Sequence, residues 1–217
     1  YVFLKRSMAR PTGFFNWGGY TTVQMVSCDV QAVCAGNSHS MLLHQDGSVW
    51  ATGWNEYGQL GDGTKTDANT FGQVVSGGVR TIAAGDTHSL VMKQDGSVWT
   101  TGSNSYGQLG DGTMSSQEVF VLVVSSGMQA VAAGAWHSMV MNANGDVWGT
   151  GANDSGQLGD GSYISKDKFV RVSTAKDDGL YFTVVWARQT CVVFEWPCVV
   201  LRSGCHLRID ICFHALA

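Results

Sequence analysis

Three histidines that recur at one position of a repeated pattern are the first residues whose type could support chemistry. His39, His88 and His137 lie 49 residues apart, each within an Ala-Gly-x-x-His-Ser motif. An imidazole can bind a metal or carry a proton. A metal site would require the three rings to meet, whereas equivalent positions of successive repeats are spread around an axis. We therefore expect structural histidines whose ring nitrogens form hydrogen bonds with backbone groups within or between repeats.

Three aspartates recur with the same spacing. Asp62, Asp111 and Asp160 each stand in a Gly-Asp-Gly turn. A Ca²⁺ site gathers six or more oxygen ligands around one ion, and one carboxylate per turn is too few. We expect each aspartate to accept hydrogen bonds from the backbone of its own turn.

Four of the six cysteines crowd into the last part of the chain, with His206 and His214 nearby. They are Cys191, Cys198, Cys205 and Cys212. Structural zinc sites normally use pairs two to four residues apart, whereas a step of seven places successive residues on opposite faces of a strand. Metal binding and a chance cluster stay as alternatives, and we favour the chance cluster. Cys28 and Cys34 lie in apolar runs and are interpreted as small core residues.

No other motif in the chain forms a recognisable catalytic set. The sequence has no Gly-x-Ser-x-Gly elbow, no phosphate-binding loop and no His-Glu-x-x-His motif. We predict a protein that is not an enzyme and that uses neither a cofactor nor a metal.

An internal repeat of 49 residues determines where all these side chains lie. Gly-Gln-Leu-Gly-Asp-Gly occupies residues 58–63, 107–112 and 156–161, and Asp/Asn-Gly-x-Val-Trp occupies residues 46–50, 95–99 and 144–148. The repeated tryptophans are expected to pack between units as large apolar plates. Such fixed positions indicate the scaffold of a repeat protein. They include His39, His88, His137, Trp50, Trp99, Trp148, Gly58, Gly107 and Gly156.

Composition favours short strands joined by glycine turns. The chain has 28 Gly and 2 Pro, and 44% of its residues are hydrophobic. Asp-Gly between two β-rich runs, as at Asp95-Gly96, predicts a hairpin with a type I′ turn, which needs positive φ at both central residues. Each unit holds about four such runs, the content of one propeller blade. We predict an all-β fold.

The repeat also divides the chain. We expect a degenerate remnant over residues 1–22, three repeats within 23–172 (24–72, 73–121 and 122–170), and a Cys-rich tail over 173–217 that lacks the repeat. The tail is interpreted as foreign to the propeller, as a shifted reading frame or an unspliced intron would make it.

Charge and hydropathy exclude two kinds of partner. The net charge is −4 and no Lys/Arg cluster is present, so direct binding of nucleic acid is not expected. No apolar run approaches the roughly 20 residues of a membrane helix, so no membrane partner is expected. The compartment stays open, with the cytoplasm or nucleus favoured.

The combined motif of residues 23–172 resembles the repeat of the regulator of chromosome condensation family. The resemblance implies a seven-bladed β-propeller, of which this chain carries three recognisable four-stranded blades. It also implies a rival function, because the founding member is a guanine-nucleotide exchange factor for a small nuclear GTPase and docks on nucleosomes. Three units of equal length leave no room for the β-wedge insertion that exchange requires.

Positions that differ between otherwise identical units are candidates for contact with a partner. They fall in loops before the repeated histidines and before the repeated Gly-Gln-Leu-Gly, where binding residues gather on repeat folds. Core packing explains any one of the aromatic members equally well. The candidates are Trp54, Glu56, Tyr57, Tyr106, Trp136 and Asp154.

These observations favour a non-enzymatic module that binds another protein through loops on one face. Nucleotide exchange on a small GTPase and inhibition of a secreted enzyme are the alternatives. An arc of three blades exposes the apolar flanks of its end blades, so we also expect marginal stability or self-association through the open edges.

Overall fold

The computed structural model describes residues 16–17, 20–21 and 29–173. The tail with its four cysteines and Cys28 lie outside these residues, as does most of segment 1–22. Every regular element in the described part is a strand. The strands are β1 (Asn16–Trp17), β2 (Tyr20–Thr21), β3 (Val30–Ala35), β4 (His39–His44), β5 (Val49–Gly53), β6 (Ala68–Val75), β7 (Val79–Ala84), β8 (His88–Lys93), β9 (Val98–Gly102), β10 (Gln117–Val124), β11 (Met128–Ala133), β12 (His137–Asn142), β13 (Val147–Gly151) and β14 (Lys166–Ser173). No helix in that part is long and apolar enough to span a bilayer.

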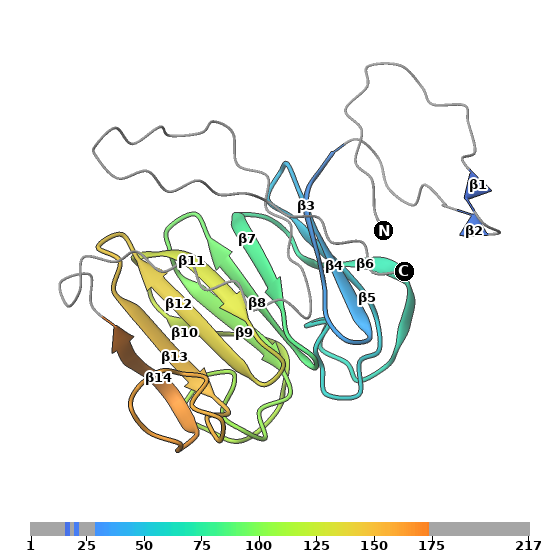
Figure 1. The fold of residues 1–217 in the computed structure, drawn as a ribbon. Helices are drawn as coiled ribbons and strands as arrows, with labels where there is room; N and C mark the ends of the chain where they lie inside the picture. Colours follow the sequence, from blue (N-terminus) through green and yellow to red (C-terminus); the bar gives the residue numbers. More distant parts are fainter. Residues whose placement is uncertain (1–15, 18–19, 22–28, 174–217) are drawn as a thin grey trace.

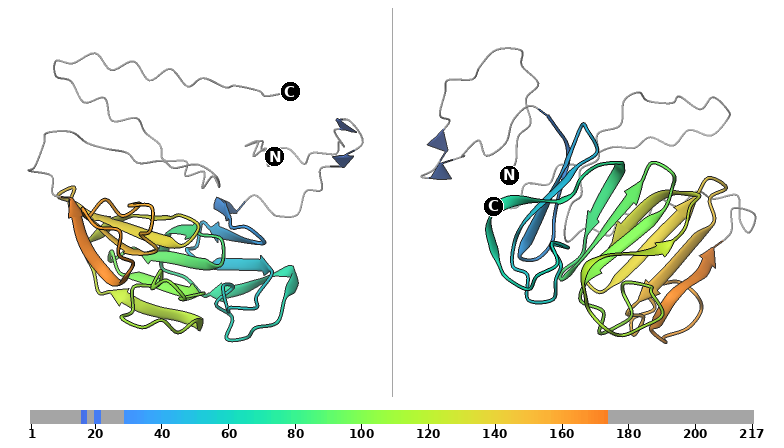
Figure 2. Two further views of the ribbon diagram at one scale, coloured as in Figure 1. Left: turned by 60° about the horizontal axis from the view of Figure 1, so that its bottom comes forward. Right: turned by 180° about the vertical axis from the view of Figure 1, so that it is seen from behind.

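Twelve of these strands form three antiparallel sheets of four strands each. The first sheet is β3-β4-β5-β6, the second β7-β8-β9-β10 and the third β11-β12-β13-β14, each paired in chain order. The sheets stack face to face as an open arc, blue to orange in Figure 1 and seen from two other sides in Figure 2. β1 and β2 pair separately as a short hairpin. The predicted all-β fold with four strands per repeat is confirmed.

The hairpin turns differ from the predicted type. In the second sheet the Gly96 N–H donates to the Lys93 carbonyl (3.0 Å) and the Lys93 N–H to the Ser97 carbonyl (2.9 Å). Gly96 has φ +78°, whereas no described non-glycine residue has positive φ. This is a type I turn followed by a left-handed glycine, the three-residue hairpin loop. The type I′ prediction is therefore wrong, because Asp95 keeps negative φ and accepts a bond from the Ser97 N–H (2.9 Å).

Two apolar clusters fill the spaces between neighbouring sheets. Met41 and Leu43 of the first sheet are fully buried against Ile82 and Val91 of the second. Leu90 and Met92 point from the opposite side of the second sheet toward Val140 of the third. Trp99 packs against the first cluster and Trp148 against the second. Each sheet thus supplies one face to each neighbour.

A buried hydrogen-bond relay joins each sheet to the next. His39 Nε2 lies 2.9 Å from Ser89 Oγ of the second sheet, and the Ser89 hydroxyl donates to the Gln59 carbonyl (2.7 Å). Because the hydroxyl hydrogen is committed to Gln59, the histidine must donate its Nε2–H to Ser89. His88 and Ser138 repeat the arrangement between the second and third sheets, again at 2.9 Å. The partner of Nε2 is therefore a serine hydroxyl and not a backbone group as predicted.

Burial keeps these imidazoles neutral. Desolvation lowers the pKa of His39 to about 4 and that of His88 to about 3. Both Nδ1 atoms are buried without a hydrogen-bond partner, so a proton there would have no acceptor. Protonation is consequently incompatible with the relay.

Glycines let each Gly-Gln-Leu-Gly-Asp-Gly segment lie directly on the next sheet. A Cβ on Gly107 would come within 2.6 Å of Asp167 Cα, and one on Gly110 within 2.6 Å of the Phe169 ring. The Gly112 N–H donates to the Asp167 carbonyl (2.8 Å). The Gly63 N–H donates in the same way to the Glu118 carbonyl (2.9 Å). The repeated glycines are therefore required by close approach between sheets.

Ser89→Ala is expected to lower the free energy of unfolding by about 1–3 kcal/mol, because it leaves His39 Nε2 and the Gln59 carbonyl buried without a partner. Ser103→Ala is the matched control, since Ser103 is also buried and Ala152 stands at its position in the third sheet. Denaturant unfolding measures both. Equal effects of the two substitutions would contradict the relay.

Acidification is expected to destabilise the fold well before the carboxylates titrate. The unfolded histidines bind protons below about pH 6.5 while His39 and His88 stay neutral in the fold. Stability present above pH 6.5 should be lost toward pH 4, by up to about 1.4 kcal/mol per pH unit for each histidine. Denaturant titrations at pH 7, 6 and 5 test this. A free energy of unfolding that is constant over this range would show that the rings are not buried neutral.

Candidate functional site

The loops predicted to carry partner contacts meet at one end of every sheet. One set of loops spans residues 36–38, 85–87 and 134–136, and a longer set, here called the connectors, spans residues 54–67, 103–116 and 152–165. The Trp54 N–H donates to the Ser38 carbonyl (2.8 Å), and the Ala152 N–H to the Trp136 carbonyl (2.8 Å). The equivalent bond in the second sheet joins Ser103 to Thr87 (2.8 Å). We call this combined surface the loop face.

An aromatic pair crosses from one sheet to the next on the loop face. Tyr106 of the second connector stacks on Trp136 of the third sheet, with ring centroids 5.6 Å apart and an interplanar angle of 25°. Tyr106 is 44% exposed and Trp136 46%. Stacking holds both rings in place while leaving much of their surface open to solvent.

The other candidate residues take three different positions. Trp54 and Tyr57 of the first connector are half-buried and form an edge-to-face pair with centroids 5.3 Å apart. Glu56 is exposed between them. Asp154 is exposed on the third connector, where it accepts a hydrogen bond from Gln157 Nε2 (3.3 Å). The structure thus places all six candidates on the loop face but joins only Tyr106 and Trp136 across a boundary between sheets.

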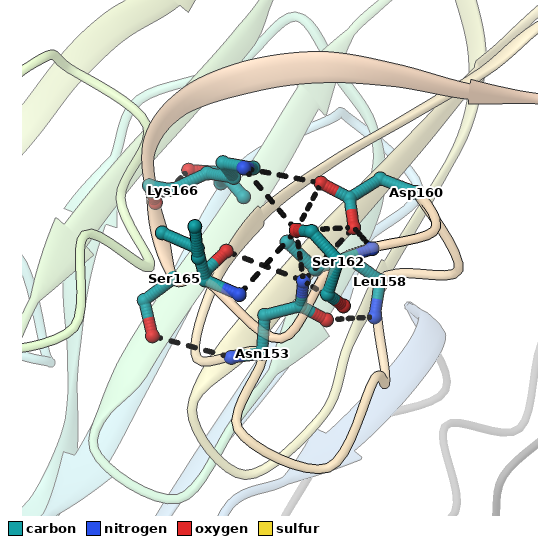
Figure 3. A network of polar contacts seen from close by, with 8 residues as sticks. Asn153, Leu158, Asp160, Ser162, Ser165 and Lys166 are labelled. Carbon is teal, nitrogen blue, oxygen red and sulfur yellow. Dashed lines mark hydrogen bonds and ion pairs between the residues drawn. The ribbon is translucent and has the colours of Figure 1, made fainter.

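A buried asparagine gives each connector its shape, shown for the third in Figure 3. Asn153 Oδ1 accepts the Leu158 N–H (3.0 Å), and Asn153 Nδ2 donates to Asp160 Oδ1 and to the Ser162 carbonyl, both at 3.0 Å. Asp160 also accepts the Ser162 hydroxyl (2.8 Å) and pairs with Lys166 at 3.2 Å. These bonds, those from Ser162 foremost, hold the pKa of Asp160 well below its usual range. Asn55 and Asn104 make the equivalent bonds in the other connectors.

The loop face is acidic. The two sets of loops contain one lysine, Lys65, and no arginine. Lys65 pairs with Glu118 at 3.4 Å. The acidic side chains of these loops are Glu56, Asp62, Asp67, Asp86, Asp111, Asp154 and Asp160.

Three exposed apolar side chains of the connectors were missed by the sequence prediction. Met114 is 56% exposed, Tyr163 75% and Ile164 68%. They follow the Gly-Asp-Gly turns, where Lys65, Met114 and Tyr163 occupy one equivalent position. Comparison of units beyond the Gly-Gln-Leu-Gly segment would have found them, because these positions vary in the same way as the chosen ones.

The described part of the chain gathers no group of three or more histidine, cysteine or carboxylate side chains able to hold a metal ion. Asp62 accepts bonds from the Thr64 N–H and hydroxyl, both at 2.9 Å, within its own turn. The loop face presents exposed aromatic rings, apolar side chains and carboxylates on hydrogen-bonded loops.

Models of one repeat family match the chain over consecutive segments. The description "Regulator of chromosome condensation (RCC1) repeat" applies to two models, one matching residues 30–59, 79–108 and 128–157 and the other residues 46–92 and 95–141. Together these segments run without a gap over more than half of the chain. No curated protein matches it.

Solved structures share the fold. Prp20p from Saccharomyces cerevisiae is similar at 21% identity with a TM-score of 0.61, over 69% of this chain and 39% of that one. Human WBSCR16 is similar at 24% identity with a TM-score of 0.62, over 71% of this chain and 40% of that one. The chain thus spans about two fifths of the length of these structures. The chain belongs to the regulator of chromosome condensation (RCC1) repeat family, and its three sheets are blades of a partial propeller of that type.

Proposed function

We propose that this chain is a non-catalytic module that binds another protein through the loop face. The observation that carries the proposal is the stacked pair of Tyr106 and Trp136, two large rings held across neighbouring sheets and nearly half exposed. Fixed aromatic side chains supply contact area at little cost in conformational entropy, and they dominate the energetics of protein interfaces. Met114, Tyr163 and Ile164 are further exposed apolar side chains on the connectors.

The charge of the loop face favours a partner segment with basic side chains. Glu56 and Asp154 are exposed on the same loop face. Asp86 is half-buried, and its N–H donates to the Ala135 carbonyl (3.1 Å), next to Trp136 in the chain. Arginine and lysine are attracted both by carboxylates and by the faces of Trp and Tyr rings. A basic segment lying over the Tyr106–Trp136 pair would satisfy both.

One relative, seen in two solved structures, indicates which proteins to test. Prp20p is described with binding properties toward Gsp1p and histones, and yeast RCC1 (Prp20) with Kap60 bound. Histones offer basic segments and are the first probe that the acidic loop face suggests. Stimulated nucleotide exchange on a small GTPase is the second candidate function, favoured by membership of the family alone.

Trp136→Ala is expected to raise the dissociation constant for a histone complex at least about tenfold, as loss of a central aromatic contact does. Leu122→Ala is the matched control, because Leu122 is 49% exposed but lies on β10, away from the loops. Isothermal titration calorimetry measures both, and raising the salt concentration should weaken the wild-type complex further. Equal affinity of wild type and Trp136→Ala would overturn the loop face as the binding surface.

A direct assay of nucleotide exchange distinguishes the exchange hypothesis from the proposal of a binding module. Addition of this chain to a small GTPase loaded with a fluorescent guanine nucleotide is expected to leave the release rate unchanged. A full-length exchange factor of the family, such as its founding member, serves as the positive control. Robust stimulation by this chain would defeat the proposal of a purely binding module.

A further inference from the structure

The third connector has the same internal shape as the two that lie between sheets. The Leu158 N–H donates to Asn153 Oδ1 at 3.0 Å, the length of the Leu109–Asn104 bond in the second connector. Gly159 has φ +71°, against +74° for Gly110. The third connector therefore has the shape of a connector that contacts a following sheet, although no fourth sheet lies on it within the described part of the chain.

Among the described residues, the outward side of the third connector is open at Gly159, and a Cβ on Gly156 would meet only the Tyr163 ring, at 3.4 Å. A Cβ on Gly61 would come within 2.6 Å of the Phe120 ring, whereas one on Gly159 would meet no described atom within 4 Å. Gln59 and Gln108 are fully buried by the following sheet, whereas Gln157 is half-buried. The space that a phenylalanine of the next sheet takes in both described interfaces is open here.

The histidine of the third sheet lacks the partner that its two counterparts have. His39 and His88 each meet a serine hydroxyl at 2.9 Å. His137 has no such hydroxyl among the described residues and is half-buried. The relay that begins at His137 therefore has its histidine but lacks its serine hydroxyl among the described residues.

The first sheet presents the opposite half of the same interface. Ser40 is half-buried, whereas its counterparts in the other sheets, which receive a histidine, are fully buried. Thr52 donates to the Ala68 carbonyl (2.8 Å) but, unlike Thr101, to no connector among the described residues. Phe71 on β6 is equivalent to Phe120 and Phe169, whose rings lie over Gly61 and Gly110. Ser40, Thr52 and Phe71 therefore occupy the three positions that a connector contacts in the two described interfaces.

We infer that the third connector and His137 form a docking site for the first sheet of a second copy of this chain. By the pattern of the two described interfaces, His137 Nε2–H donates to Ser40 Oγ of the second copy, and that hydroxyl donates to the Gln157 carbonyl. The Gly161 N–H donates to the Asn69 carbonyl, as Gly112 does to Asp167. The Phe71 ring covers Gly159.

The resulting contact is head to tail. Each copy uses its third sheet on one side and its first sheet on the other, so the two surfaces differ and the second copy supplies the missing serine. A contact of this kind produces a closed ring if the rotation between copies closes and a growing chain of copies if it does not. The site uses the outward side of the third connector, so it shares that connector with the loop face, but it involves neither Tyr106 nor Trp136 and does not depend on the proposed function.

The test compares the association of the full chain, measured by sedimentation, with that of two variants, each altered on one side of the contact. Wild type is expected to associate as its concentration rises. Gly159→Ala, which places a methyl group where the Phe71 ring sits, and Phe71→Ala, which removes that ring, should each raise the dissociation constant at least about 30-fold. Gly127→Ala is the matched control, because Gly127 also has positive φ (+86°) and an open Cβ position, yet lies outside the docking site.

Mixing the two variants separates this contact from any other mode of association. Phe71→Ala keeps an intact third connector and Gly159→Ala an intact first sheet, so the mixture should form a one-to-one dimer that does not grow. Circular dichroism confirms that each variant is folded. A wild type that stays monomeric, variants that still associate alone, or a mixture that stays monomeric would each overturn the inference.

Discussion

The whole structure depends on how closely each connector approaches the sheet that follows it. A Cβ at Gly107 or Gly110 would overlap backbone or an aromatic ring of the next sheet, so only glycine permits the contact. That approach brings the Gln59 carbonyl within reach of the Ser89 hydroxyl, and the hydroxyl in turn receives the His39 ring. Three segments distant in the sequence are thereby fixed by one short chain of hydrogen bonds. A sheet therefore obtains part of its stability from its neighbour.

The same arrangement explains how the loop face can vary in sequence while the scaffold stays constant. Each connector is shaped from inside by an asparagine, such as Asn153, that satisfies the backbone of its own loop. Side chains that point outward, such as Trp136 and Tyr163, take no part in those bonds and are free to differ between units. Rigid backbone with variable side chains is what a binding surface on a repeat protein requires.

The fold followed from the sequence because its determinants are local and repeated. Val-Trp after an Asp-Gly turn predicts a hairpin strand in one unit, and three occurrences remove the ambiguity. The turn type could not be predicted, because Asp95-Gly96 fits both a type I′ turn and a type I turn with a left-handed glycine. The hydrogen-bond partner of His39 could not be predicted from the sequence either. Ser89 lies 50 residues away, and only the spatial stacking of the sheets brings the two together. The contact between Tyr106 and Trp136 could not be predicted for the same reason. The sequence identifies each residue as a separate candidate, and the two rings meet only across the boundary between neighbouring sheets.

The near identity of the two interfaces has a consequence for how the chain reaches this structure. The first connector finds on the third sheet the same serine and threonine that it contacts on the second, since Ser138 and Thr150 repeat Ser89 and Thr101. Pairing with the wrong sheet doubles the length of the closed loop, which costs only about 0.6 kcal/mol in chain entropy. Correct order thus rests on the time at which each sheet becomes available and only slightly on its chemistry. Synthesis from the N-terminus presents the second sheet before the third exists, whereas a denatured full-length chain meets both at once and can trap the middle sheet outside the stack.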